Sequence, residues 1–264
     1  MQKQTFWNWV LDINFYDKMR KYWVVKLLVL LVIISPSCKK DPFGDCFKST
    51  GKITSEDRTF TGSFNTIEVN DNVNLIYTDD STNQSIKVEA GNNLLSEITT
   101  EIQNNKLILH NNNKCNWVRK FGVPINIYVH AHPIIKIIQN GSGNVSGTNT
   151  ITEDSFNFEG WGAGECNLSI NVNNLYCSLN LDAGDATLTG HADAAFLYNA
   201  GNGFFYNNGL TTGFTSVLAL GTGDSYVNVQ DLLWVTIKQE GNVYYIGNPA
   251  VKDTITGKGQ LIKQ

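Results

Sequence analysis

The chain has 264 residues and a formal net charge of −4, so its length suits one large domain or two small ones. The charge is unevenly distributed, because residues 141–237 contain nine Asp and Glu residues but no Lys or Arg. An acidic surface of this kind repels the phosphate backbone of nucleic acids and the anionic headgroups of membranes. The composition therefore argues against nucleic acid as a partner and against electrostatic docking to lipid.

The N-terminal part has the features of an export signal. A basic pair at 20–21 precedes an apolar run of 11 residues, interrupted by one lysine, at 24–34, and small residues then lead to Cys38. This arrangement is typical of bacterial lipoprotein signals, although Ser35 stands where an aliphatic residue is usual. A single membrane anchor helix is the alternative, but the run is shorter than the roughly 20 residues that a span needs. We therefore predict a signal peptide at 19–37 and a lipid anchor on Cys38.

The boundaries of the other segments follow from this signal. Met19 directly precedes the basic pair, so we expect translation to begin there and residues 1–18 to be a gene-model extension. An unusually long basic region is the alternative. Residues 38–58 are polar and lack periodicity, which suits a tether between a lipid and a folded body. We expect residues 59–264 to form a single domain.

Short strands are predicted ahead of the repeats. Five runs alternate apolar and polar residues and are bounded by Asn, Asp or Gly, at 64–69, 73–77, 86–90, 106–109 and 125–129. Residues 91–98 are expected to form one short helix or turn, and nothing longer has a helical period. The first part of the domain is therefore predicted to be all-β.

Glycine recurs about every 20 residues through the C-terminal half. The triplets stand at 141–143, 162–164, 183–185, 201–203, 221–223 and 240–242. A fixed period of this length indicates stacked repeats, in which no single unit buries its own apolar face. Each repeat within 134–247 offers two short strands joined at Gly and Asn corners, and stacking them places Cys177, Leu197 and Val235 inside. We therefore predict an all-β parallel β-solenoid with about 20 residues per turn.

Over residues 60–247 the chain resembles a known family. The resemblance rests on the strand at 64–69, on 93–109, on Val-Pro-Ile-Asn-Ile-Tyr-Val at 123–129, and on the Gly-Ser-Gly-Asn core within 138–145. These segments are similar to the putative autotransporter-adhesin head domain, or GIN domain, of exported proteins from Bacteroidetes-type bacteria. Trp161 departs from the pattern, because a large aromatic interrupts the small residues around it. The resemblance implies a right-handed parallel β-helix, similar in shape to pectin lyases, and a role in adhesion.

Four thiols remain if Cys38 carries lipid, and four cysteines allow three pairings. Cys46 and Cys115 lie outside the repeats in polar surroundings, where an oxidising compartment would favour a disulfide between them. Cys166 and Cys177 fall in the apolar phase of their strands, about half a repeat apart, which would place them on walls separated by roughly 10 Å. That separation is too large for a disulfide. We interpret both as buried, unreactive thiols, with a bridge between them as the alternative.

A pectin-lyase-like shape suggests a polysaccharide lyase, but the groups that the reaction needs are missing. Such enzymes neutralise a uronate with a cation and use a base, commonly Arg or Lys, and residues 141–237 contain neither. Asp182, Asp185 and Asp224 could bind calcium, but an Asp beside a Gly more commonly shapes a turn. A glycosidase needs two carboxylates facing one cleft, and nothing in the sequence places such a pair. No catalytic residue is predicted.

The histidines and glycines do not point to a cofactor. His130 and His132 could place two imidazoles on one strand face, but the sequence shows no third ligand nearby, so we expect ordinary surface histidines. The Gly-x-Gly triplets precede strands rather than helices, so the helix dipole that holds a phosphate is missing. We predict no metal site and no cofactor.

One outward pattern suggests a binding face. If Cys177 points inward, its neighbour Tyr176 points outward. The equivalent outward positions in later repeats are Phe196, about Thr215, and Trp234, with Tyr198 beside them. An aromatic ladder on a flat β-face could stack on sugar rings or bind a partner protein. Burial beneath residues 248–264, or a phase error of one residue, is the alternative.

These observations predict an exported, lipid-anchored solenoid at the outer membrane, on the cell surface or the periplasmic face. We expect a non-catalytic binding or adhesion module for a polysaccharide or another surface protein. One alternative is a structural envelope or assembly component that uses the solenoid as a rigid spacer. A less expected alternative is a carbohydrate-active enzyme.

Overall fold

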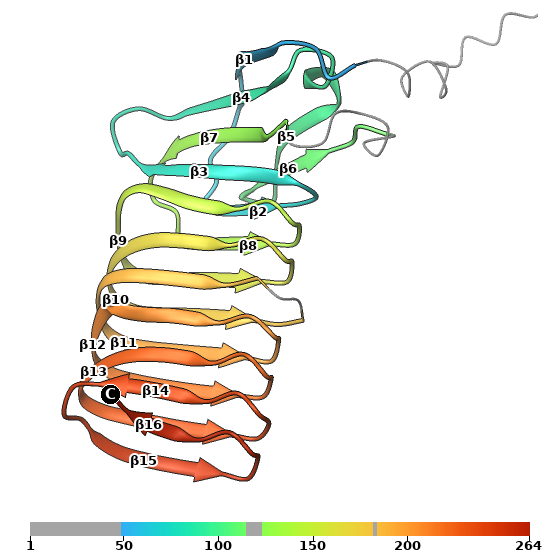
Figure 1. Cartoon of the computed structure of the whole chain (residues 1–264). Coiled ribbons are helices and arrows are strands. Elements are labelled where there is room, and N and C mark those ends of the chain that lie inside the picture. The colour runs from blue at the N-terminus through green and yellow to red at the C-terminus, as the bar shows by residue number, and fades with distance from the viewer. Residues whose placement is uncertain (1–48, 115–122, 182–183) are drawn as a thin grey trace, which may run out of the picture. The chain divides into compact units, whose positions relative to one another are not determined.

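A computed structural model describes residues 49–114, 123–181 and 184–264 (Figure 1). They form an all-β parallel solenoid of about six turns, as the glycine spacing predicted. The short helix or turn expected at 91–98 is confirmed as a single 3₁₀ turn, η2 (Leu95–Glu97). Cys38, Cys46 and Cys115 lie outside the described residues, and so do the predicted signal peptide and most of the tether.

The N-terminal end of the solenoid is closed by a cap of short strands. The cap strands and those beside them are β1 (Ile53–Arg58), β2 (Thr66–Val69), β3 (Val73–Asp79), β4 (Ser85–Gly91), β5 (Ile98–Gln103), β6 (Lys106–Asn111), β7 (Ile125–Ala131) and β8 (Lys136–Gln139). The pairs β1–β4, β4–β7 and β5–β6 are antiparallel, whereas β3–β7 and β2–β8 are parallel. Antiparallel strands cover the exposed edge that a stack of parallel turns would otherwise leave.

All five strands predicted in this part are present, as β2, β3, β4, β6 and β7. The sequence reasoning missed β5 and β1, and β1 lies within the segment assigned to the tether. The five side chains of Ile53–Asp57 are exposed, so β1 carries no buried apolar phase that could have revealed it. Its strand conformation comes from pairing with β4 along its whole length.

The body of the solenoid consists of long parallel strands stacked one above the next. These are β9 (Val145–Gly160), β10 (Cys166–Leu179), β11 (Ala186–Asn199), β12 (Phe205–Ala219) and β13 (Ser225–Ile237). Each strand bends in its middle, so it contributes one arm to each of two walls. After β13 the two arms become separate strands: β14 (Val243–Ile246) continues the first arm of β13, and β15 (Ala250–Ile255) continues the second. The chain ends with β16 (Leu261–Lys263), which pairs with β14.

The core is a set of inward columns that run along the solenoid axis. Cys177 pairs with Leu197, Leu197 with Val217, and Val217 with Val235, and each of these side chains is at most 3% exposed. Phe158 extends the column on β9. The predicted inward column is therefore confirmed. Alternation of buried and exposed residues along each strand provides this column, because neighbouring side chains of a strand point to opposite faces.

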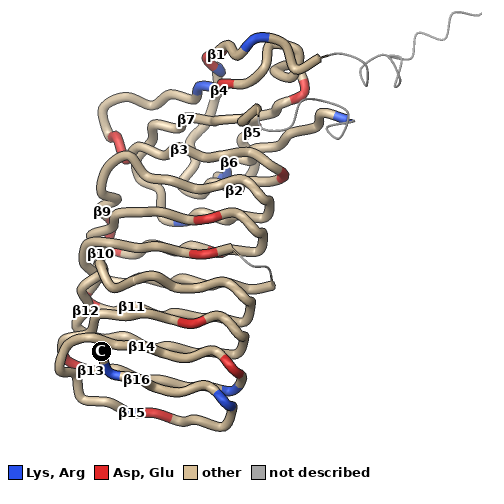
Figure 2. The backbone as a smooth tube through the Cα atoms, viewed as in Figure 1, with Lys and Arg blue, Asp and Glu red and all other residues tan. Residues whose placement is uncertain are grey.

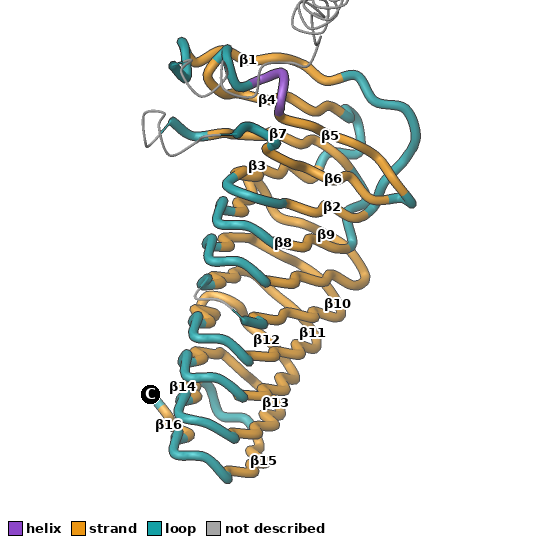
Figure 3. The backbone as a smooth tube through the Cα atoms, turned by 90° about the vertical axis from the view of Figure 1, so that its right-hand side faces the viewer, coloured by secondary structure: helices purple, strands orange, loops and turns teal. Residues whose placement is uncertain are grey.

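Glycine recurs at the corners because successive corners lie in direct contact. A Cβ atom on Gly223 would lie 1.8 Å from the carbonyl oxygen of Gly203, and one on Gly221 would lie 1.9 Å from that of Gly201. These glycines do not adopt a positive φ, so the requirement is close backbone approach rather than a left-handed turn. Figure 3 shows the corner loops aligned along one edge of the stack. The side-chain amide of Asn199 is buried there and donates to the carbonyl oxygens of Gly203 and Gly223.

Cys166 and Cys177 are both buried and both free. Burial raises the pKa of each thiol above its ordinary value, which keeps both protonated at neutral pH. The interpretation of these two cysteines as buried thiols without a bridge is confirmed. Protonated thiols without solvent access are poor nucleophiles and poor metal ligands.

Candidate functional site

Aromatic side chains line the outer surface of the second arms, on β10 to β13. We call Tyr176, Phe196, Phe214 and Trp234 the Trp234 ladder. Tyr176 pairs in register with Phe196, and Phe196 is followed by Ser216 and Trp234. The side chains of Tyr176, Phe196 and Trp234 are 46%, 37% and 45% exposed, so the structure places these predicted residues on the outer surface. Tyr198 is 37% exposed and stands two positions further along β11.

The rings of this ladder contact one another. Tyr176 and Phe196 are stacked with centroids 5.0 Å apart and an interplanar angle of 10°. Phe214 meets Phe196 at 5.7 Å and Trp234 at 5.4 Å, both edge to face. The ammonium group of Lys252 lies 5.1 Å from the Trp234 ring centroid, in a cation–π geometry. The stack therefore covers one face of the Tyr176 ring and one face of the Phe196 ring.

The prediction that Thr215 belongs to the ladder is wrong by one residue. Thr215 is 1% exposed, pairs with Ala195 and Leu233 in the core, and shares a hydrogen bond with Thr212. The register advances by 20 residues from Phe196, which places Ser216 at the outward position. Ser216 is too small to continue the stack, and Phe214 fills the gap.

The alternative that residues 248–264 cover the ladder is also wrong. This segment contains β15 and β16, which add the last turn of the solenoid instead of folding back over it. In this turn Lys252 pairs with Trp234 and therefore extends the column. Within the part of the chain that the structure describes, Tyr176, Phe196 and Trp234 therefore stay exposed to solvent.

A second aromatic column, which the sequence reasoning missed, follows the first arms. We call Phe204, Tyr206, Tyr226 and Tyr244 the tyrosine ladder. Tyr206, Tyr226 and Tyr244 stand in register on successive strands, with stacked rings 5.6 Å and 4.7 Å apart. Burial, together with the nearby Asp224 carboxylate, raises the pKa of Tyr226, so its phenol is neutral at physiological pH. Alternation along the strands could have revealed this ladder. Tyr206 and Tyr226 are direct neighbours of the inward residues Phe205 and Val227, so their side chains point outward.

The walls between the two ladders carry few cations. Figure 2 shows that Lys and Arg gather at the two ends of the stack and are nearly absent from its middle turns. Lys136, near the N-terminal end of the repeats, forms an ion pair with Glu159 at 2.6 Å. The corner acids Asp185 and Asp224 bond to the next repeat: Asp185 accepts the backbone N–H of Phe204, and Asp224 accepts that of Asn242. Asp182 lies outside the described residues.

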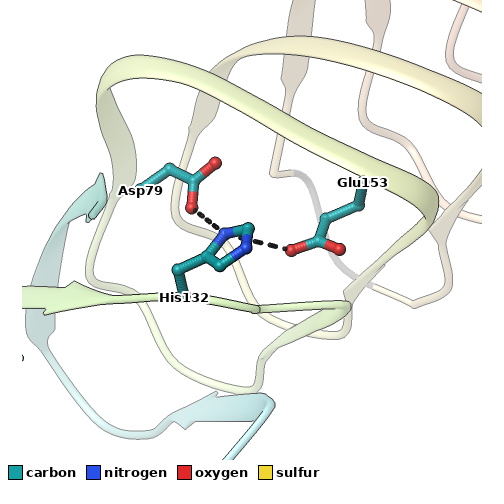
Figure 4. A group of neighbouring side chains, drawn as sticks. All are labelled: Asp79, His132 and Glu153. Carbon is teal, nitrogen blue, oxygen red and sulfur yellow. Dashed lines mark hydrogen bonds and ion pairs between the residues drawn. The ribbon is translucent and has the colours of Figure 1, made fainter. Parts of the chain in front are cut away.

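His132 has two acidic neighbours from distant parts of the chain (Figure 4). Its Nδ1 lies 2.8 Å from Asp79 Oδ1 and 3.5 Å from Glu153 Oε1. His130 instead contacts Asp80, at 3.6 Å. The expectation of no third potential ligand near His132 is therefore wrong. Spacing along the chain did not reveal the group, because the fold brings together residues 53 positions apart.

The chain belongs to the family of putative auto-transporter adhesins with a head GIN domain, because residues 63–249 match that family's profile. The fold and the exposed ladders define a β-solenoid with aromatic side chains on its outer surface. This family is the one that the sequence resemblance indicated. The membership supports an adhesion-type role and a surface or exported location, and it gives no indication of catalysis. Within the described residues, no helix is long and apolar enough to span a membrane.

Solved structures show the same fold. A putative adhesin from Bacteroides fragilis has a TM-score of 0.76 at 20% identity, covering 82% of this chain and 100% of that one. A putative adhesin from Parabacteroides distasonis has a TM-score of 0.60 at 19% identity, and the match covers 82% of this chain and 100% of that one. A putative lipid binding protein from the same organism has a TM-score of 0.64 at 16% identity, and the match covers 82% of this chain and 99% of that one. No curated protein matches the chain.

Proposed function

We propose that this protein is a non-catalytic adhesion module, exported and held at the outer membrane by a lipid on Cys38. Its contact face is the Trp234 ladder, an apolar column that crosses four successive strands and remains exposed to solvent. Exposed, contiguous aromatic surface on an otherwise polar protein commonly marks an interaction site. The family membership supports the adhesion-type role.

The ring geometry favours a protein partner over a polysaccharide. Sugars stack on open aromatic faces, but the faces of Tyr176 and Phe196 cover each other, and Phe214 and Lys252 both approach the Trp234 ring. The remaining edges form an apolar strip with little charge. Such a strip suits a complementary apolar protein surface, whose binding energy is concentrated in a few large aromatic residues.

The test compares binding by two tryptophan variants. Trp234→Ala removes a ladder ring, and Trp161→Ala removes a tryptophan of similar exposure, 40% against 45%, that stands outside the ladder. We expect wild type and Trp161→Ala to bind immobilised envelope fractions equally, and Trp234→Ala to bind at least about tenfold more weakly. Circular dichroism of each variant controls for folding.

Treatment of the envelope fraction identifies the class of partner. Protease should abolish binding, and periodate, which destroys glycans, should leave it intact. Binding that survives protease and fails after periodate would favour a polysaccharide. Equal binding by Trp234→Ala and wild type, or no saturable binding by wild type, would favour the structural spacer role instead.

A further inference from the structure

We propose that Asp79, His132 and Glu153 bind a divalent transition-metal ion of the Zn²⁺ class at the junction of cap and solenoid. Asp79 is the last residue of β3, His132 directly follows β7, and Glu153 lies near the bend of β9. The three elements are held next to one another, because β3 pairs in parallel with both β7 and β9. The site is separate from the aromatic ladders and does not depend on the proposed adhesion role.

The spacing of the three groups fits a metal ion. One ligand atom from each residue lies within 4.8 Å of the other two. Around tetrahedral Zn²⁺, with bonds of about 2.1 Å, neighbouring ligand atoms are about 3.4 Å apart. The contacts of His132 Nδ1 with Asp79 and Glu153, at 2.8 Å and 3.5 Å, bracket that value. Small side-chain movements would therefore bring the three ligand atoms to the separations that Zn²⁺ requires.

The ligands are held in place by surrounding groups. Asp79 Oδ2 accepts a hydrogen bond from the backbone N–H of Thr152, and the Tyr77 hydroxyl lies 3.2 Å from Asp79 Oδ1. The Asp79 side chain is only 9% exposed, so its position is restricted. Such outer contacts orient metal ligands and increase their affinity.

Glu153 is incompletely satisfied by protein groups. Its Oε1 atom is buried and forms no hydrogen bond. His132 Nδ1 carries at most one hydrogen, and the Asp79 oxygen at 2.8 Å is the closer of the two carboxylate oxygens. A metal ion would instead engage all three atoms, and two carboxylates with a neutral imidazole match its double positive charge.

The site has an open side and a preference for certain metals. A depression of about 400 Å³ adjoins the ligands and is lined by Thr152, Asp154, Asn171, Asn173 and His191. Three protein ligands and one accessible position are typical of Zn²⁺ sites that retain a water molecule or accept an external ligand. A nitrogen ligand favours transition metals, whereas Ca²⁺ and Mg²⁺ prefer oxygen ligands alone.

Titration of the untagged, EDTA-treated protein with ZnCl₂, followed by calorimetry, tests the proposal. We expect one Zn²⁺ per chain, a raised unfolding temperature when Zn²⁺ is present, and no comparable effect of Ca²⁺. His132→Ala should weaken binding at least tenfold. Glu153→Gln should do the same while nearly preserving side-chain shape and removing a buried charge, so a folding defect would not explain its loss of binding.

His110→Ala is the matched control, because His110 forms a surface pair with Asp71 at 3.2 Å and belongs to no group of three potential metal ligands among the described residues. It should bind Zn²⁺ like wild type. The proposal is overturned if wild type shows no saturable Zn²⁺ binding, if His132→Ala and Glu153→Gln bind as wild type does, or if Ca²⁺ binds as tightly as Zn²⁺.

Discussion

Replacing Gly223 by alanine should destabilise the solenoid strongly, because its corner lies directly against the preceding one. The new Cβ would lie 1.8 Å from the carbonyl oxygen of Gly203, whereas real Cβ contacts are no shorter than 3.0 Å. The two corners must therefore separate by about 1.2 Å, the difference between these distances. Movement of this size cannot be absorbed by a side chain, because the atoms nearest to the new Cβ all belong to the backbone.

The cost follows from the bonds that cross this corner. Asn199 Nδ2 donates to Gly203 O at 2.9 Å and to Gly223 O at 3.1 Å, and separating the corners breaks at least one of these buried bonds. Losing them costs about 2 kcal/mol, and overpacking adds about 1–3 kcal/mol. We expect Gly223→Ala to lower the free energy of unfolding by about 3–5 kcal/mol, which corresponds to a fall of about 10 °C in Tm for a domain of this size.

Urea denaturation and thermal unfolding measure the effect, with Gly213→Ala as the control. Gly213 lies on β12, and a Cβ there would meet its nearest atoms at 3.2 Å, so only a slight adjustment is needed. This control should remain within about 1 kcal/mol of wild type. Equal stability of the two variants would refute the argument that corner contact, rather than chain flexibility, requires the glycines.

Two further predictions concern the cap and the anchor. Lys106 Nζ lies 2.6 Å from Glu68 Oε2, and although partial burial of Glu68 acts to raise its pKa, this ion pair holds the pKa below its ordinary value of 4.5. The stabilisation is therefore present above about pH 4.5 and lost as the pH falls through the lowered pKa, so Lys106→Met should cost about 1 kcal/mol at pH 7 and less at pH 3 in urea titrations. A cost that does not change with pH would contradict this. When the full chain is expressed with an alkyne-labelled fatty acid, wild type should incorporate the label and Cys38→Ala should not; equal labelling of both would exclude the lipid anchor on Cys38.

Much of the fold could be predicted because its signals are local. The recurrence of glycine indicates a repeated corner, and alternation along each strand assigns Cys177 and Leu197 to the interior. The same alternation placed Tyr176 and Trp234 outside. The prediction for Thr215 failed because the spacing of outward positions varies from turn to turn, and a one-residue error exchanges the two faces.

The tertiary structure decided the features that depend on contacts between distant segments. β1 is recognisable as a strand only through its pairing with β4. The ring contacts within the Trp234 ladder depend on Phe214, which stands two positions before Ser216 on β12 and meets both Phe196 and Trp234. None of these relations has a signature in the spacing of residues along the chain.

The contrast is clearest at the glycines and at His132. The sequence by itself determined the period, the parity of the strands and the shortage of basic residues, because these are properties of neighbouring residues. Only the tertiary structure showed that Gly223 meets the Gly203 carbonyl, and that Asp79 and Glu153 converge on His132. Such meetings are set by how successive turns and the cap stack in space, and chain spacing does not specify that stacking in atomic detail.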